Sequence, residues 1–192
     1  VMLRRMIALA LFVVAGFVIA GSPANAAADW TEYVFAEDEF AVQFPVPPTT
    51  GSEIYETSIT EALPARTYWA EYDNILFKVR VFSIGDMIDQ AANFVVEAAY
   101  NQMRQGNVLF NDFPRVGLSG NATFGITMTL DTEDGRRIRS SYFSENERVY
   151  LVEATVMPER GDLDQIVPSR FDQTLRLRLE ARLNDTVPGL AR

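Results

Sequence analysis

The residues that could do chemistry in this 192-residue chain are carboxylates, arginines and aromatic side chains, because the sequence contains no histidine and no cysteine. Serine–histidine and cysteine–histidine catalysis, thiol redox chemistry and nearly all zinc, copper and haem ligation need one of those two residues. We therefore expect no metal centre and no cofactor. What remains is acid–base catalysis by carboxylates, or the binding of a partner.

Three carboxylates, Glu71, Asp131 and Glu153, fall on segments that alternate in the manner of β-strands. Two carboxylates at a suitable separation can act as acid and base, or hydrolyse a glycosidic bond. The chain carries 26 acidic residues, however, and most of these are expected to be solubilising charge. A carboxylate-dependent periplasmic hydrolase is therefore the alternative function and not the leading one.

The segment 131–135, Asp-Thr-Glu-Asp-Gly, superficially resembles a calcium-binding loop. An EF-hand loop needs oxygen ligands at positions one, three and five, glycine at six and glutamate at twelve. Here the glycine comes one position early, and the later Asn-Glu is out of phase. The pattern favours a hairpin turn over a metal site.

Basic residues form two pairs on expected strands, Arg137 with Arg139 and Lys78 with Arg80. We expect each pair to lie on an outer strand face, and the two pairs to join in one surface with Trp69 beside Lys78. Guanidinium forks on such a surface would bind the carboxylates of an acidic partner. The alternative is a solvated strand face that the three carboxylates named above neutralise.

The first 26 residues have the three parts of a secretory signal peptide. Arg4 and Arg5 give a positive start, residues 6–20 are apolar, and Ala24-Asn25-Ala26 offers small residues for cleavage. An uncleaved anchor is the alternative, although the apolar run is shorter than the roughly 20 residues that a spanning helix needs. The arginine pair leaves a twin-arginine route open beside general export. We expect a periplasmic or secreted protein.

Residues 27–183 are then expected to form a single domain, followed by a loose C-terminal tail at 184–192. Without the two N-terminal arginines, 15 basic residues remain against 26 acidic ones, a net charge of −11. That charge argues against nucleic acid and against anionic lipid surfaces. The partner we expect is an exported or envelope protein with an acidic surface, and no stable membrane insertion follows cleavage.

One hairpin is expected from residues 66–72 and 75–82, joined by Asp73-Asn74. A two-residue turn there places Ala70 opposite Phe77 and gathers apolar residues on one face.

A second hairpin is expected from residues 123–132 and 136–144. A two-residue turn would set Leu130 opposite Arg139 and mix the two faces. A three-residue turn with Gly135 in the left-handed conformation sets Leu130 opposite Ile138 instead, and we choose that register.

The clearest helix is expected at Asp86–Gln105, with Asp86 as its N-cap and Gly106 ending it in the left-handed conformation. One apolar stripe of this helix should face the sheet; its members are Ile88, Ala91, Ala92, Val95, Ala99 and Met103. Further strands are expected at 30–35, 40–44, 54–59, 108–110, 115–120 and 148–157, with helical spacing over 163–175 and a closing strand at 175–179. Together these elements predict an α+β fold.

Three stretches resemble the PsbP-like family of small exported domains, named after an extrinsic protein of photosystem II. They are Phe40-Ala41-Val42-Gln43-Phe44-Pro45, Arg148-Val149-Tyr150-Leu151-Val152 and the closing segment Ser169–Leu175. The resemblance implies an antiparallel β-sheet flanked by helices, an α/β/α sandwich, in which members act as accessory subunits or protein binders. The histidine metal ligands of some members are absent here. The leading function is therefore an exported, non-catalytic accessory or binding domain that acts through a protein partner or a small ligand.

The export signal makes a direct prediction about the mature N-terminus. N-terminal sequencing of the protein from the periplasmic fraction should begin close to Ala27, because cleavage follows the small residues before it. An intact N-terminus in the membrane fraction would contradict this expectation.

Overall fold

The structure, a computed structural model, describes residues 29–116, 123–163 and 166–177. The expected signal peptide and the expected tail at 184–192 lie outside the described residues. The strands are β1 (Thr31–Phe35), β2 (Phe40–Phe44), β3 (Thr49–Tyr55), β4 (Leu63–Tyr72), β5 (Ile75–Ser83), β6 (Gly106–Asp112), β7 (Arg115–Val116), β8 (Thr123–Thr132), β9 (Arg137–Glu145), β10 (Arg148–Val156) and β11 (Arg176–Leu177). The helices are α1 (Ala91–Met103) and α2 (Ile166–Gln173), with 3₁₀ turns η1 (Ala36–Asp38), η2 (Gly85–Gln90) and η3 (Pro158–Arg160).

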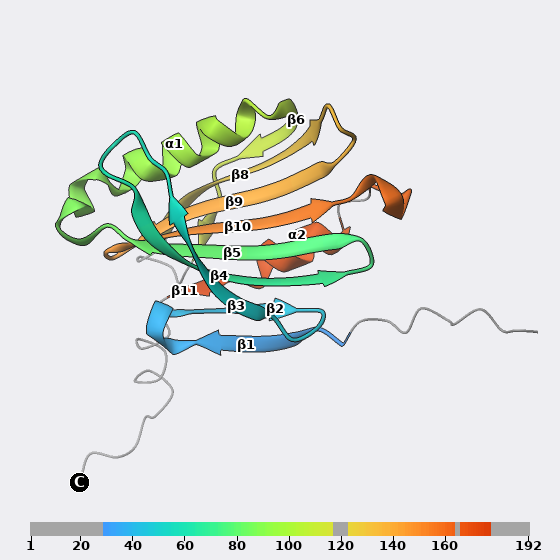
Figure 1. Ribbon diagram of the computed structural model, residues 1–192, viewed down its shortest axis with the longest axis horizontal. Coiled ribbons are helices and arrows are strands. Elements are labelled where there is room, and N and C mark those ends of the chain that lie inside the picture. The colour runs from blue at the N-terminus through green and yellow to red at the C-terminus, as the bar shows by residue number, and fades with distance from the viewer. Residues whose placement is uncertain (1–28, 117–122, 164–165, 178–192) are drawn as a thin grey trace, which may run out of the picture.

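The strands form two antiparallel sheets (Figure 1). The large sheet has the order β3-β4-β5-β10-β9-β8-β6, and β7 also pairs with β8. The small sheet has the order β1-β2-β11. Among the described helices, none is long and apolar enough to cross a membrane.

Both expected hairpin registers are confirmed. Ala70 pairs with Phe77 across a two-residue turn whose residues Asp73 and Asn74 both have positive φ. Leu130 pairs with Ile138 across the longer turn. Gly135 has φ +84° there, as the chosen three-residue turn requires.

The two hairpins bury opposite faces of the large sheet, which the sequence did not predict. Phe77 pairs with Ala154 of β10, and Ile138 pairs with the next residue, Thr155. Successive residues of a strand point to opposite faces. On each face of the large sheet, the apolar side of one hairpin therefore lies next to the polar side of the other.

Strand β10 joins the two halves of the sheet because it is apolar on both faces. The run 149–152 is buried without interruption. Tyr150 and Val152 belong to the core beneath the small sheet, whereas Val149 and Leu151 belong to the core beneath α1.

Helices flank the large sheet, but not as a symmetrical sandwich. In Figure 1, α1 lies across one face, over β8, β9 and β10. The opposite face is covered by the small sheet together with the short α2. The Phe171 ring of α2 packs at steep angles against the rings of Phe44 and Phe77, with centroids 5.0 and 5.2 Å apart. The fold is thus mostly antiparallel sheet with one main helix, and the α/β/α expectation is correct only in part.

The expected helix at Asp86–Gln105 is too long, and both of its expected ends are wrong. Residues 85–90 form a 3₁₀ turn with Met87 outside helical geometry, and α1 begins at Ala91 without a side-chain cap. Gly106 does not end the helix but opens β6. A Cβ atom on Gly106 would lie 2.1 Å from the carbonyl oxygen of Asp131, so glycine is needed for the close approach of β6 to β8.

The expected strand at 54–59 is also displaced. Strand β3 covers residues 49–55, and the following loop instead binds α1. Thr57 and Ser58 donate hydrogen bonds to the carboxylate of Glu97 at 2.5 to 2.6 Å. Burial raises the pKa of Glu97, but these hydrogen bonds outweigh it and leave the pKa below its ordinary value. Two other expected strands, at 115–120 and 175–179, are described only in part, because residues 117–120 and 178–179 lie outside the described residues.

The left-handed turn at Gly135 predicts a ranked effect of substitution. Gly135→Ala should lower the free energy of unfolding by about 1 kcal/mol, because a Cβ atom is strained at positive φ. Gly135→Asn should cost less, since asparagine tolerates this conformation better. Urea denaturation measures both variants. Equal stability of wild type and both variants would mean that the turn does not need this conformation.

Candidate functional site

The four basic residues singled out by the sequence do not form one surface. Arg139 pairs with Ala154, which places it on the same face as Phe77. Lys78 pairs with Glu153 and therefore lies on the opposite face. The expectation that Lys78 and Arg80 join Arg137 and Arg139 is wrong, because the two hairpins bury opposite faces of the sheet.

Arg137 is held by groups of its own chain. Its Nε and Nη2 atoms donate to the two carboxylate oxygens of Asp131 at 2.6 and 2.7 Å, and its Nη1 atom donates to the carbonyl of Leu163 at 2.8 Å. The hydrogen bond from Arg137 lowers the pKa of Asp131. This bidentate pair occupies the guanidinium fork that the expected partner would have used.

Lys78 and Arg80 share one carboxylate, that of Glu53 on β3. The Lys78 ammonium lies 2.8 Å from it, and Arg80 forms a second ion pair. Burial raises the pKa of Glu53, but its contacts with the two cations leave that pKa below its ordinary value. Trp69, which pairs with Lys78, is half-buried and packs over Gly51, where an added Cβ would lie 2.9 Å from the ring. Lys78 and Arg80, like Arg137, therefore have a carboxylate partner in their own chain.

Arg139 forms the most buried of these ion pairs, with Asp172 of α2. Its Nη2 atom lies 2.9 Å from Oδ2 of Asp172, and the two side chains are only 13% and 8% exposed. Ser141 donates to the same carboxylate at 2.8 Å, and the Ser141 hydroxyl lies 2.6 Å from that of Thr127. This chain of polar groups connects α2 to β9 and β8.

The Arg139–Asp172 pair lies in a groove of about 630 Å³ between α2 and the edge of the large sheet, called the β6 groove from here on. Its lining combines apolar and polar side chains, namely Phe110, Asp112, Pro114, Thr127, Arg139, Phe143, Ser169, Asp172, Gln173 and Leu175. Phe110 pairs with Thr129 and so lies on the face of the sheet that is turned away from α1. Arg139 is thus one predicted site residue, of the five, that lines a groove. Its charge, however, is already paired with Asp172.

Three large apolar side chains are exposed at this edge within five residues. Leu109, Phe110 and Phe113 have 48%, 47% and 67% of their surface exposed. The register of β6 against β8 shifts between Val108 and Phe110, which leaves Leu109 as an extra residue in a β-bulge. The sequence predicts a strand here, at residues 108–110, but gives no sign that its side chains are exposed.

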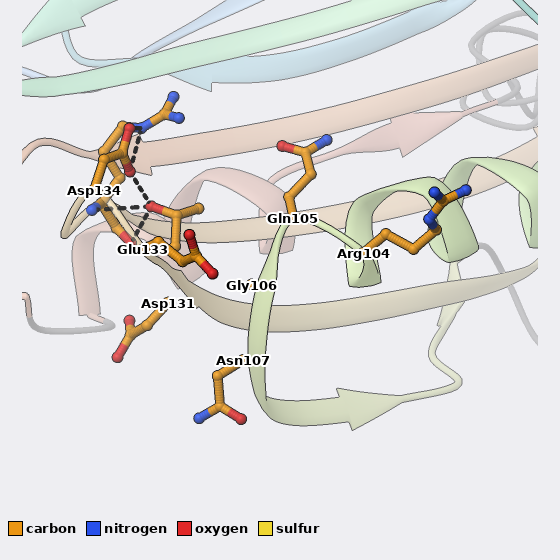
Figure 2. A pocket seen from close by; sticks show the side chains of 9 residues that line it. Arg104, Gln105, Gly106, Asn107, Asp131, Glu133 and Asp134 are labelled. Atoms are coloured by element: carbon orange, nitrogen blue, oxygen red, sulfur yellow. Dashed lines mark hydrogen bonds and ion pairs between the residues drawn. The ribbon is translucent and has the colours of Figure 1, made fainter.

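A second hollow, of about 890 Å³, lies between the end of α1 and the turn that joins β8 to β9 (Figure 2). Its acidic residues do not converge: in Figure 2, Asp131 points away from Asp134. Asp134 binds Arg136 at 2.8 Å and accepts a hydrogen bond from Thr132, and these contacts lower its pKa to about 2. No group of three potential metal ligands occurs in the part of the chain that the structure describes.

The three carboxylates considered for catalysis are not brought together. Glu71 and Glu153 lie on the α1 side of the sheet, whereas Asp131 lies on the other side. Every displaced carboxyl pKa in the described ranges is lowered, at Glu53, Glu97, Asp131 and Asp134. A carboxylate pair that divides the roles of acid and base needs one pKa raised.

A buried carboxylate, that of Asp38 in the 3₁₀ turn η1, connects the two sheets. Asp38 accepts a hydrogen bond from the hydroxyl of Tyr68 at 2.5 Å and pairs with Arg66 at 2.9 Å. Tyr150 donates to the Asp38 carbonyl at 2.8 Å. Burial and the hydrogen bond to Asp38 both raise the pKa of Tyr68. These contacts hold the β1–β2 connection on the large sheet.

Comparison with known proteins gives a likeness in fold alone. No protein-family model and no curated protein sequence matches the chain. The structure is similar to that of cyanobacterial PsbP (CyanoP) from Synechocystis sp. PCC 6803, with a TM-score of 0.49 and 8% identity over 83% of this chain and 98% of that chain. It is also similar to a Pseudomonas aeruginosa protein of unknown function described as a putative regulator, with a TM-score of 0.37 and 12% identity over 84% and 99% of the two chains. The likeness to cyanobacterial PsbP is in line with the resemblance seen in the sequence.

The buried ion pair of the groove predicts a strong asymmetry between single and double variants. Asp172→Ala should lower the free energy of unfolding by about 3–5 kcal/mol, because it leaves the Arg139 charge buried and unpaired. The double variant Arg139→Met with Asp172→Leu should cost clearly less, because no charge is then stranded. Urea denaturation of each variant measures the difference.

Glu32→Ala is the matched control, since it breaks the half-exposed pair of Glu32 with Arg176. Exposed pairs contribute about 0–1 kcal/mol. If Asp172→Ala costs no more than this control, Arg139 is not neutralised in the way described.

Proposed function

We propose that this protein is an exported, non-catalytic accessory domain that binds a partner protein at the β6 groove. The observation that supports this most directly is the exposure of Leu109, Phe110 and Phe113 beside the groove. Large apolar side chains exposed close together are typical of an interaction site. An edge strand such as β6 can also pair its main chain with an added segment.

A binding role fits the chemistry of the described residues better than a catalytic one. A hydrolase would need two carboxylates that converge with pKa values displaced in opposite directions. The candidate carboxylates lie on opposite faces of the sheet, and the displaced pKa values are all lowered. The groove is lined by two carboxylates, Asp112 and Asp172, but Asp172 is neutralised by Arg139.

The groove favours a partner segment with an apolar anchor and a neighbouring basic residue. The apolar anchor would pack between Phe110 and Leu175, both of which line the groove. Because Arg139 is already paired with Asp172, it contributes little attraction for an acidic partner. Asp112 at the exposed rim would instead attract a basic side chain. The acidic partner expected from the sequence depended on arginines without carboxylate partners.

Site-specific photo-crosslinking tests this proposal in cells that export the protein. A photoreactive phenylalanine at position 113 should capture a partner through a segment that carries apolar and basic residues. The additional substitution Phe110→Asp should reduce the adduct at least about tenfold, because a carboxylate removes the apolar wall that the anchor needs. Mass spectrometry of the adduct identifies the partner segment.

Position 34 provides the control, because Val34 is 60% exposed but lies on β1 in the small sheet. Val34→Asp should leave the adduct at position 113 unchanged. The proposal fails if position 113 captures no more than position 34, or if Phe110→Asp leaves the yield unaltered.

A further inference from the structure

Helix α1 has a second apolar stripe that faces away from the sheet. Ala92, Val96, Tyr100 and Met103 follow one another at spacings of four, four and three residues, which places them on one side of a helix. All four are exposed, Val96 at 56% and Tyr100 at 59%. Ile88 of the preceding 3₁₀ turn is exposed too. We call these five residues the α1 outer stripe.

The outer stripe is not needed to hold α1 on the sheet. That task belongs to the buried side chains of the opposite side, Phe94, Val95, Ala98 and Ala99, which pack in the core with Leu130. Ile88, Ala92 and Met103, which were expected to face the sheet, are exposed, so that expectation is wrong. A helix with apolar residues on both sides is typical of one that packs on two surfaces.

We propose that the α1 outer stripe is a self-association surface, on which α1 of a second copy packs antiparallel about a two-fold axis at Val96. A two-fold interface must be complementary to itself, so a large residue has to meet a small one. With Val96 on the axis, Tyr100 of one copy faces Ala92 of the other. The stripe therefore contains both the large residue and the small residue that a two-fold contact needs.

The charges along the same side of the helix agree with the antiparallel arrangement. Asp89 lies in the 3₁₀ turn that precedes α1, Arg104 follows the last residue of α1, and both are exposed. An antiparallel pair places Arg104 of each copy beside Asp89 of the other, whereas a parallel pair would place like charges together. In one chain these two residues are about 20 Å apart along the helix, too far to interact. Within one chain the Arg104 guanidinium lies over the ring of Tyr100 instead, 5.9 Å from its centroid, and Asp89 can meet it only from a second copy.

This surface is distinct from the one proposed for a partner protein. The outer stripe lies on the helix that covers one face of the large sheet, and the β6 groove opens on the other face. Self-association through α1 leaves the groove open. The two proposals therefore stand or fail separately.

The absence of native cysteine allows a direct test by crosslinking. In the purified protein, Val96→Cys should give a covalent dimer on a non-reducing gel under mild oxidation, because the axis brings the two copies of position 96 together. Asn101→Cys is the matched control: it is exposed on the same helix but lies away from the stripe, and it should remain monomeric on the gel. The proposal is overturned if both variants crosslink to the same extent, or if neither does.

Light scattering and sedimentation then test the orientation in the cysteine-free protein. Wild type should have twice the mass of one copy, and Arg104→Asp should raise the dissociation constant about tenfold. Adding Asp89→Arg should restore the wild-type value, because the exchanged charges meet again across the axis. A wild type that stays monomeric at about 100 µM, or a double variant no better than the single one, overturns the proposal. Circular dichroism confirms that each variant is folded.

Discussion

The double-sided burial of β10 is the constraint on which the rest of this structure depends. The segment 149–152 places Tyr150 and Val152 in one core and Val149 and Leu151 in the other. Each such side chain contributes roughly 1.5–3 kcal/mol when it is fully buried. Because β10 lies between β5 and β9, it allows the hairpin on each side to bury a different face. A polar residue in this run would place a polar group without a hydrogen-bond partner in one of the two cores.

The offset of the two cores explains where polar groups and grooves occur. Beyond β10, the β9 and β8 strands present Arg139, Ser141 and Thr127 toward the side where the small sheet lies. The small sheet packs on the apolar half formed by β4, β5 and β10, so α2 is the element that meets these polar residues. Asp172 neutralises Arg139 there, and the space between α2 and β6 becomes the groove. The groove thus exists because the two cores lie over different strands of the large sheet.

The sequence predicted what depends on neighbouring residues and missed what depends on distant ones. The registers of both hairpins follow from turn length and from the sorting of apolar residues within each hairpin, so they were predictable. Alternation alone does not say which face of a sheet a hairpin buries, and therefore Lys78 and Arg139 were wrongly placed together. The uninterrupted apolar run of β10 is the signal that both faces are covered.

The pairing of Arg139 with Asp172 illustrates the same limit, because the partners are 33 residues apart and meet only when α2 packs on the sheet. Phe171 is fully buried in the core, and its position determines where the next residue, Asp172, points. The exposure of Phe110 could not be read from the sequence, since an apolar residue in a strand is more often buried. For α1, apolar residues on two sides made the sheet-facing stripe ambiguous, and only the packing of Phe94 and Ala98 resolves it.

The distribution of apolar surface has a consequence for assembly. The described chain exposes apolar side chains along α1 and at the β6 edge, on opposite faces of the large sheet. Its acidic character keeps separate copies apart at long range, so association requires contacts that outweigh this repulsion. The exchange of Asp89 and Arg104 between antiparallel helices supplies attraction where the copies meet. A pair joined through α1 would hold both β6 grooves on its outer sides, and two grooves in one assembly bind a partner with two matching segments more tightly than one groove does.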